Sequence, residues 1–586
     1  MEKLLSGNEA IARGAFEAGA EAAFAYPGTP STEILQYISS EFPEIYSEWA
    51  PNEKVSLESA IGSSLYGART LVAMKHVGLN VAADPLFSLS YMGVNGGMVI
   101  VTADEPSMFS SQNEQDNRWY GIFAKIPVLE PSDSQEAKEL VKEGFKLSEK
   151  YDTPVILRIT TRIAHSKTIV TLENRETPPS GFSYKKNFRK NILMPMNARI
   201  KHRIVEERME NLKAVSEDFS FNRHIPGKGR AIITSGIDFQ YVREAFPEAD
   251  ILKICLSNPL PKQLISDFID RHRGRVSVIE SLDPVMESRI KSWGYSRING
   301  KDKTGLLYEL SPEKLQRVFS EQQETMENSE TDTTLPSRPP VLCAGCPHRG
   351  IYHSLRKQKA IIHGDIGCYT LGALPPLEAM DTCVCMGASI SMANGMTAML
   401  VRNGETSPPI FATIGDSTFI HSGIQPLIDA VYNQIPTHVI ILDNRITAMT
   451  GHQVNPVTGL NIKGEEAPML DLKKVCLAIG IKEVDTVDPW DLKEITEALN
   501  KHKELNEPSV IISKGPCALI PFYQASAPYQ VDTDKCTLCK ACIRTGCPAI
   551  SVKNNKSHID INSCTGCGVC FQVCKFDAIH QIKENE

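Results

Sequence analysis

Cysteines near the end of the chain have a spacing that suits iron-sulfur chemistry. Eight of the sixteen cysteines lie after residue 530, in two runs that mostly leave two residues between neighbours. A cubane cluster can take three thiolates from one such run and the fourth from the other. The spacing therefore predicts two [4Fe-4S] clusters, one held by Cys536, Cys539, Cys542 and Cys574 and the other by Cys564, Cys567, Cys570 and Cys547.

Structural zinc is the alternative for these cysteines, because zinc also binds four thiolates from C-x-x-C pairs. Zinc sites usually combine two separated pairs, whereas each run here contains three closely spaced cysteines. One departure from the iron-sulfur pattern is that four residues separate Cys542 from Cys547, where three are usual. The spacing favours clusters and leaves the local geometry around Cys547 open.

Two polar groups follow apolar runs in the second half of the chain. Asp416 comes just after Ile410–Ile414, and Asn444 comes just after His438–Leu442. If both runs are parallel strands, these groups lie at the carboxyl edge of one sheet, where such sheets bind ligands. Carboxylate and amide oxygens suit Mg²⁺, which usually also binds phosphate oxygens. Strand-end Asp and Asn can instead cap helices or form turns, and that alternative applies to either residue alone.

The pair as a whole resembles the Gly-Asp-Gly to Asn-Asn signature of thiamine diphosphate-dependent enzymes. Ser417 replaces the second Gly and Asp443 the first Asn, while both expected Mg²⁺ ligands are present. The resemblance implies a third ligand in the backbone carbonyl of Ile446. It also implies that the cofactor is contacted by Gly415, Met386 and Gly387.

Glu53 is the candidate for the acid that thiamine chemistry requires, a carboxylate hydrogen-bonded to N1′ of the aminopyrimidine ring. It begins an expected helix over Glu53–Ala68, in which Gly62 would allow close approach. Thiamine-dependent pyrimidine-binding domains resemble this arrangement. The alternative is that Asn52 caps the helix and that Glu53 merely suits the helix dipole. Glu58 is the rival acid.

A further group of cysteines lies in the middle of the chain. Cys343 and Cys346 form a C-x-x-C pair, Cys368 follows about twenty residues later, and Cys517 is distant. A buried pair that binds nothing, or a redox dithiol, is the alternative. The remaining cysteines have no such pattern and are expected to be core thiols, namely Cys255, Cys383, Cys385 and Cys476.

These motifs together resemble the 2-oxoacid:ferredoxin oxidoreductases, and in particular the large (alpha) subunits of indolepyruvate ferredoxin oxidoreductases. The resemblance covers essentially the whole chain and is carried by Tyr26–Pro30, Asn52–Val55, Met74–Asp84, Cys343–Arg349 and the tail cysteines. It implies a third cluster held by Cys343, Cys346, Cys368 and Cys517. It also implies that Thr29 contacts the 2-oxo acid group, with Lys75 or His76 in the same pocket, although His76 could equally be a structural histidine.

The resemblance further implies that arylpyruvates are converted with coenzyme A to aryl-acetyl-CoA and CO₂. Ferredoxin would accept the electrons, and a smaller beta subunit would complete a heterodimer or an α2β2 assembly. Pyruvate or another 2-oxoacid is an alternative substrate. A noncatalytic electron-transfer subunit and a non-oxidative decarboxylase are two further hypotheses. The decarboxylase would have no use for clusters, and Glu53, Asp416 and Asn444 argue against the noncatalytic subunit.

Length and composition indicate what kind of protein must hold these groups in place. A chain of 586 residues is too long for one core and suggests about three to five domains. With 42% hydrophobic and 23% charged residues, most of it should fold. A net charge of -8, with no dense basic stripe, argues against nucleic acid as a partner. Neither an export signal nor an apolar run long enough for a membrane helix is found, so a cytoplasmic location is expected.

The pattern of apolar runs predicts an α/β fold with two thiamine diphosphate-binding, doubly wound parallel-sheet domains. Ala22–Tyr26, Thr70–Met74, Met98–Thr102 and Pro154–Ile159 are the expected strands of the first. A smaller α/β domain lies between the two, and an α+β ferredoxin-like domain ends the chain. The expected limits are 1–165 for the pyrimidine-binding domain, 166–320 for a connector and a transketolase C-terminal-like domain, 321–340 for a linker, 341–525 for the diphosphate-binding domain and 526–586 for the ferredoxin domain.

Overall fold

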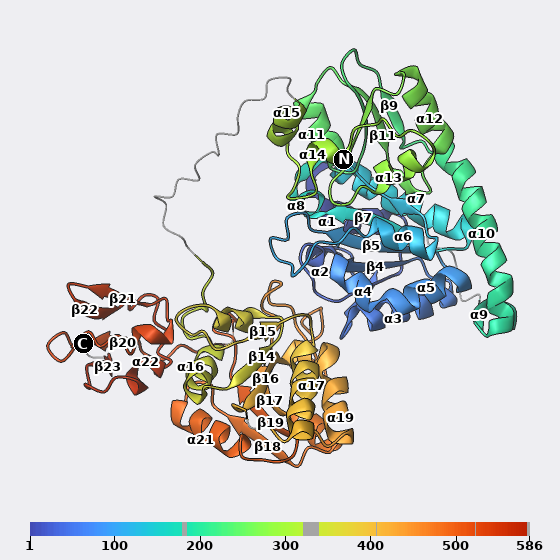
Figure 1. Cartoon of the computed structure of the whole chain (residues 1–586). Coiled ribbons are helices and arrows are strands. Elements are labelled where there is room, and N and C mark those ends of the chain that lie inside the picture. Colours follow the sequence, from blue (N-terminus) through green and yellow to red (C-terminus); the bar gives the residue numbers. More distant parts are fainter. Residues whose placement is uncertain (178–183, 320–338, 406, 522, 583–586) are drawn as a thin grey trace. The chain divides into compact units, whose positions relative to one another are not determined.

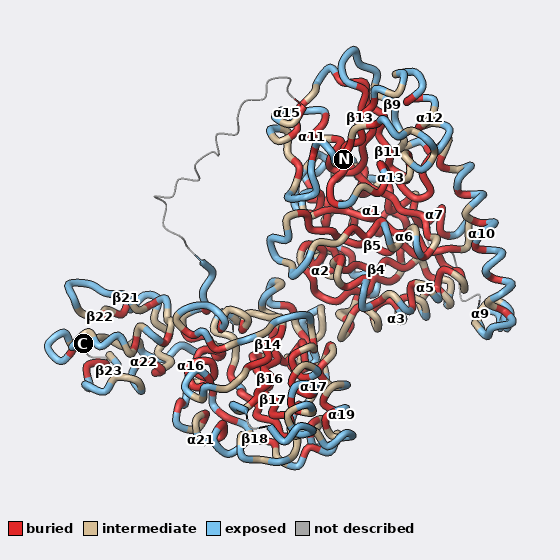
Figure 2. The backbone as a smooth tube through the Cα atoms, in the orientation of Figure 1, coloured by how far each residue is buried: buried red, intermediate tan, exposed pale blue. Residues whose placement is uncertain are grey.

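The computed structural model describes residues 1–177, 184–319, 339–405, 407–521 and 523–582. The chain forms two compact units, Met1–Thr331 and Asp332–Glu586. Each has its own parallel sheet and its own buried core, shown in red in Figure 2. Nearly all of the expected linker at 321–340 lies outside the described residues. In the described part of the chain, none of the helices has the length and apolar character that a membrane crossing requires.

The first unit contains a seven-stranded sheet in the order β12-β6-β7-β5-β4-β2-β3. The four expected strands are present as β2 (Ala22–Ala25), β4 (Thr70–Lys75), β5 (Met98–Asp104) and β7 (Val155–Thr160). They are parallel and almost wholly buried, because helices cover both faces of the sheet. The remaining strands are β3 (Tyr46–Trp49), β6 (Val128–Leu129) and the antiparallel β12 (Leu256–Asn258).

Two layers of helices enclose this sheet (Figure 1). One layer packs α1 (Gly7–Glu17) against α7 (Ser134–Tyr151) and α2 (Thr32–Glu41). The other contains α3 (Glu53–Tyr66) and α5 (Ala83–Met92), which contact each other. The alternation of strands and helices gives the doubly wound architecture that the apolar runs predict.

A smaller α/β domain follows in the same unit. Its four-stranded sheet has the order β13-β10-β11-β9. The strands β10 (Ala231–Ser235), β11 (Asp250–Ile254) and β13 (Val276–Ile279) are parallel, and β9 (Arg223–Ile225) is antiparallel. The helices are α11 (Asp238–Ala245), α12 (Lys262–Arg271) and α13 (Val285–Ser292). Since β12 leaves this domain to pair with β6, the two domains share a sheet edge.

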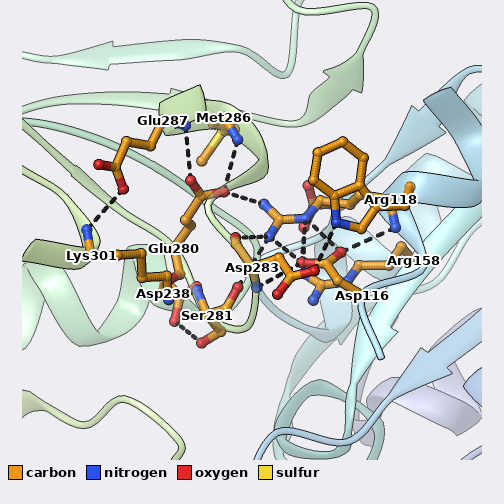
Figure 3. Close-up of polar contacts among 12 residues, drawn as sticks. Asp116, Arg118, Arg158, Asp238, Glu280, Ser281, Asp283, Met286, Glu287 and Lys301 are labelled. Carbon is orange, nitrogen blue, oxygen red and sulfur yellow. Dashed lines mark hydrogen bonds and ion pairs between the residues drawn. The ribbon is translucent and has the colours of Figure 1, made fainter. Parts of the chain in front are cut away.

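A buried ionic network also joins these two domains (Figure 3). The Arg118 guanidinium, 1% exposed, donates to Asp116 Oδ1 at 2.9 Å and to Glu280 Oε2 at 2.6 Å. Beside it, Arg158 donates to Asp104 Oδ2 at 2.8 Å and to Glu130 Oε2 at 2.6 Å. Glu280 follows β13, whereas the other five residues belong to the first domain. Charges buried this deeply persist only when they are paired, so the network fixes how the two domains meet.

The expected connector after residue 165 is more regular than its composition suggests. The strand β8 (Lys167–Thr171) pairs with β1 (Glu2–Ser6), and a helix of 23 residues, α10, covers Pro195–Glu217. The buried side of α10 repeats every three or four residues and consists of Asn197, Lys201, Val205, Arg208, Leu212 and Ser216. Most of these residues are polar or charged, which hides the helical period from a reading of hydrophobicity.

The second unit contains a six-stranded parallel sheet in the order β15-β14-β16-β17-β19-β18. Its strands are β14 (Ile361–Gly364), β15 (Thr382–Cys383), β16 (Ile410–Gly415), β17 (His438–Asp443), β18 (Glu483–Val487) and β19 (Ser509–Lys514). One face packs against α16 (His348–Gln358) and α21 (Leu492–His502). The other packs against α17 (Ala388–Asn403), α19 (Ile424–Tyr432) and α20 (Leu472–Ile479).

The cysteine-rich tail folds into two small antiparallel sheets. The strand β20 (Tyr529–Val531) pairs with β23 (Ile579–Gln581), and β21 (Ile550–Lys553) pairs with β22 (Lys556–Ile559). Its hydrophobic core is built around Cys542, Ile559, Cys570 and Ile579. Apolar burial on this scale is small for a domain of this size, so bound metal would have to contribute to its stability.

Candidate active site

In the first unit, Glu53 lies buried at the carboxyl edge of the sheet. It is the first residue of α3, which Asn52 caps by accepting a hydrogen bond from Val55 N at 2.9 Å. The side chain of Glu53 lies against Gly78 at the start of the next helix. A Cβ at position 78 would come within 2.7 Å of both Cγ and Oε1 of Glu53. The absence of a side chain at Gly78 therefore makes room for this carboxyl group.

The rival acid, Glu58, occupies a different environment. Its side chain is 46% exposed and forms an ion pair with Lys54 on the outer face of α3. Glu53 is 5% exposed. Of these two acids, only Glu53 is enclosed beside the strand ends, so it remains the one we propose for thiamine chemistry.

The remaining candidates of the first unit lie at the same edge. The loop Tyr26–Pro30 follows β2, and a Cβ at Gly28 would lie 3.1 Å from Lys75 Cβ at the end of β4. Thr29 is half-buried in this loop. Lys75 donates to Ser110 O at 2.9 Å, and burial lowers the pKa of its amine.

His76, which follows Lys75, is fully buried at the start of α4 (His76–Val81). Its Nε2 lies 3.3 Å from Asn113 O, and its Nδ1 has no hydrogen-bond partner among the described atoms. Burial, and then the charge of Lys75, lower the pKa of His76. The imidazole is therefore neutral at physiological pH.

In the second unit, Asp416 and Asn444 lie at the carboxyl ends of adjacent parallel strands. In the register of β16 with β17, Gly415 is paired with Leu442. Asp416 is 2% exposed, and its Oδ1 accepts a hydrogen bond from Ser417 N at 2.6 Å. Its Oδ2 is buried and has no hydrogen-bond partner among the described atoms.

The electrostatics of this edge suit a bound cation. Burial, and then the neighbouring Asp443 carboxyl, raise the pKa of Asp416 well above its usual value. Asn444 Oδ1 accepts from Ile446 N at 3.3 Å, which places the amide beside the third candidate ligand. A buried carboxylate oxygen without a donor, next to a second carboxylate, is the environment that a divalent cation stabilises. The residues present therefore fit Mg²⁺.

Two residues of this edge were not found from the sequence. Asp365 is fully buried after β14, and its carboxylate accepts from Gly387 N at 3.0 Å and from Ser389 N at 3.1 Å. It thereby holds the Met386–Gly387 loop at the start of α17. Asn455, whose buried Nδ2 also has no hydrogen-bond partner among the described atoms, lies close enough to the Asp416 carboxyl to oppose the rise of its pKa. Asp365 could have been found as another acid directly after an apolar run, but Asn455 belongs to no pattern.

The four middle cysteines gather close to this edge. Burial raises the pKa of Cys346 to about 12, and negative charge on Cys343 and Cys368 adds to the rise. Burial likewise raises the pKa of Cys368 to about 11, with contributions from Cys517 and Cys343. Cys517 N donates to Asn444 O at 3.2 Å. Four thiols from three separate segments thus lie near one another and near the candidate Mg²⁺ ligands.

The tail brings one complete set of four cysteines around a hollow. Cys547, Cys564, Cys567 and Cys570 line a small pocket, together with Ala344 and Gly345 of the middle pair. This set is the one predicted for the second tail cluster. Of the first set, Cys536 and Cys542 both lie beside Ser557, and Cys574 packs in the same small core as Cys542. Among the described residues, no three His, Cys, Asp or Glu side chains could hold a single metal ion.

The unassigned cysteines differ partly from expectation. Cys255 and Cys476 are buried core thiols. Cys383 and Cys385 are exposed, so the prediction that they are core thiols is wrong. They lie around the short edge strand β15, where a single neighbouring strand leaves side chains uncovered.

Replacing Cys343 with serine is expected to remove about four iron atoms per anaerobically reconstituted chain, the content of one cubane cluster. The tail clusters should remain, because their cysteines belong to a separate set. Chemical iron analysis together with electron paramagnetic resonance of the reduced protein measures both effects. Cys476→Ala removes a buried thiol outside the group and should leave the iron content unchanged. Equal iron in wild type and Cys343→Ser would contradict a cluster at this position.

Three segments of the chain match known protein families, and together they indicate the class of protein. Residues 13–218 match the family described as pyruvate flavodoxin/ferredoxin oxidoreductase, thiamine diP-bdg. Residues 365–513 match the thiamine pyrophosphate enzyme, C-terminal TPP binding domain, and residues 528–575 match the 4Fe-4S dicluster domain. The fold and these segments define a thiamine diphosphate-binding, iron-sulfur oxidoreductase of the 2-oxoacid:ferredoxin class.

Full-length relatives narrow the assignment. Indolepyruvate oxidoreductase subunit IorA of Pyrococcus abyssi is 40% identical over 100% of this chain and 97% of its own length. The subunit of the same name from Archaeoglobus fulgidus is 39% identical over 99% of this chain and 98% of its own. The chain belongs to this family of indolepyruvate oxidoreductase subunits, which confirms the resemblance inferred from the motifs. Among solved structures, 2-oxoglutarate:ferredoxin oxidoreductase from Magnetococcus marinus is 20% identical, with a TM-score of 0.42, over 54% of this chain and 64% of that one.

Proposed function

We propose that the protein catalyses the oxidative decarboxylation of arylpyruvates with coenzyme A, giving aryl-acetyl-CoA and CO₂. Indolepyruvate, phenylpyruvate and hydroxyphenylpyruvate are the proposed substrates, and ferredoxin is the proposed electron acceptor. The observation that carries the proposal is identity of about 40% along the whole chain to subunits named for indolepyruvate. Intact Glu53, Asp416 and Asn444 support a catalytic subunit over a purely electron-transferring one.

The chain's own residues have distinct parts in this proposal. Bound thiamine diphosphate would supply the nucleophilic carbon and the electron sink for loss of CO₂. Asp416, Asn444 and the Ile446 carbonyl would hold Mg²⁺ against the diphosphate, supported by the unpaired Asp416 Oδ2. Glu53 would hold a proton at the aminopyrimidine N1′. Neutral His76 and half-buried Thr29 would orient the 2-oxo acid group by hydrogen bonds.

Partners and location belong to the same proposal. A smaller beta subunit would complete a heterodimer or an α2β2 assembly, in keeping with relatives that are themselves named as subunits. Three cubane clusters, two in the tail and one on the middle cysteines, would carry single electrons to ferredoxin. All sixteen cysteines are free of disulfides, which suits a reducing compartment, so we propose the cytoplasm.

An anaerobic assay of the chain with its partner subunit tests the substrate. Indolepyruvate, phenylpyruvate and pyruvate are compared with coenzyme A and a viologen acceptor. We expect kcat/KM for the arylpyruvates to exceed that for pyruvate at least tenfold, because an aryl group buries far more apolar area than a methyl group. Preference for pyruvate would refute the arylpyruvate assignment and leave the chemistry intact. Reconstituted protein that holds neither thiamine nor iron would refute the whole proposal.

A further inference from the structure

Arg349 is a buried cation that the proposed chemistry does not use. It is the second residue of α16, three residues after Cys346, and its side chain is 1% exposed. It is among the largest fully buried side chains of the chain. A guanidinium remains charged at any physiological pH, so a positive charge is fixed at this position.

The hydrogen bonds of Arg349 connect two cysteine segments that are far apart in sequence. One terminal nitrogen donates to Leu342 O at 2.8 Å and to Cys343 O at 2.7 Å, next to the middle pair. The other donates at 2.8 Å to Thr545 O, which lies between Cys542 and Cys547 of the tail. The planar fork of arginine suits this bridge, since it offers several donors in fixed directions.

Close backbone packing supports the same junction. Gly345, inside the middle C-x-x-C pair, lies so near the second tail run that a Cβ there would meet Thr565 Oγ1 at 2.1 Å. Its φ of 69° is also one that glycine adopts readily. Next to Gly345, Trp490 Nε1 donates to Gly345 O at 3.1 Å, and Gln572 Nε2 of the tail donates to Trp490 O at 2.7 Å. The tail is therefore docked on the sheet domain through its second cysteine run.

The charge of Arg349 reaches thiols of both groups. Arg349 is hydrogen-bonded to the carbonyl oxygen of Cys343 and to that of Thr545, two residues before Cys547. Arg349 also lines the hollow that Cys547, Cys564, Cys567 and Cys570 surround. A group of four thiolates with iron and sulfide is net negative and becomes more so when it gains an electron, and a buried cation stabilises the added charge.

We propose that Arg349 is a positioning residue that ties the middle cysteine group to the second tail cluster and favours electrons on both. This proposal rests on the cluster assignments of the proposed function. Since the dielectric screening is weak in a buried site, the cation should raise the reduction potential of each neighbouring cluster. It would thereby make an added electron more favourable on either cluster.

The test is a redox titration of full-length, anaerobically reconstituted protein, followed by electron paramagnetic resonance. Arg349→Gln keeps polar donors and loses the charge. Its iron content should match wild type. At a fixed potential, the ratio of reduced to oxidised second tail cluster should fall about tenfold, which corresponds to a reduction potential lower by about 59 mV for a one-electron couple. Arg349→Lys keeps the charge and should change that ratio less than about threefold. The electrostatic stabilisation of the reduced cluster depends on the positive charge and not on the planar shape of the guanidinium group.

The matched control is Arg356→Gln on the same helix. Arg356 is 42% exposed and pairs with Glu378 at 3.0 Å, so both solvent and a carboxylate screen its charge. Its variant should titrate like wild type. The proposal is overturned if Arg349→Gln leaves the ratio unchanged, or if Arg356→Gln shifts it equally. It is also overturned if Arg349→Lys and Arg349→Gln both lose tail iron, since the role would then be structural only. Because no substrate is used, these outcomes are independent of whether arylpyruvates are oxidised.

Discussion

Turnover of Glu53→Gln is expected to fall by about 10²- to 10⁴-fold, the range for loss of a positioned proton-transfer group. Glutamine has nearly the same volume as glutamate, so the space that Gly78 leaves should still be filled. It cannot hold the proton that the aminopyrimidine requires in the proposed chemistry. Steady-state rates with indolepyruvate, coenzyme A and a viologen acceptor, measured anaerobically with the partner subunit, give the effect.

Glu58→Gln is the matched control for this experiment. It is the same substitution on the same helix, at a residue that is exposed and paired with Lys54. Exposed ion pairs contribute little, so its rate should stay within about twofold of wild type. Iron content and thermal unfolding should be unchanged in both variants. Glu53→Gln with more than a tenth of the wild-type rate, or an equal loss in Glu58→Gln, would remove Glu53 from the proposed chemistry.

The parts of the fold that were predicted from sequence are those whose burial is uniform. Strands β2, β4, β5 and β7 have both faces covered, so most of their residues are apolar and each run can be recognised without an alternating pattern. Helix α10 was missed because its buried side includes Lys201 and Arg208. Arg208 is buried with its guanidinium on the carbonyl oxygens of Ser90 and Asp152. Charged residues of this kind look like solvent-exposed ones until their partners are known.

The residues of the candidate site likewise include some that the sequence predicts and some that it does not. Asp416, Asn444 and the cysteines could be named because spacing along the chain reports groups at adjacent strand ends or in one tight turn. Asp365 and Arg349 act on segments 22 and 196 residues away. No local pattern encodes such contacts. Their roles become visible only when the sheet has aligned its strand ends and the tail has docked beside Cys343.

Replacing Arg118 with methionine is expected to destabilise the first unit by about 3–5 kcal/mol. This is the usual effect of removing one partner of a buried ion pair, because the other partner stays buried without its counter-charge. Methionine keeps much of the volume but leaves Asp116 and Glu280 without their counter-charge. Pulse proteolysis in urea, following fragments from residues 98–160, reports this unit without requiring the whole chain to unfold in one step. Arg162→Met is the control, since Arg162 is 53% exposed and pairs with Glu309 at 2.8 Å. It should lose less than about 1 kcal/mol.

The pH dependence of this loss distinguishes an uncompensated charge from a simple packing defect. Burial raises the pKa of Glu280 above its usual 4.5, and Arg118 opposes that rise. Without Arg118 the folded pKa rises further, so the folded variant binds more protons than the unfolded chain at every pH between the two values. Stability of the variant relative to wild type should therefore fall as pH increases above the usual pKa of 4.5 and partly recover on acidification. A deficit that is constant across this range would show that Arg118 contributes packing alone, and that Asp116 and Glu280 do not depend on its charge.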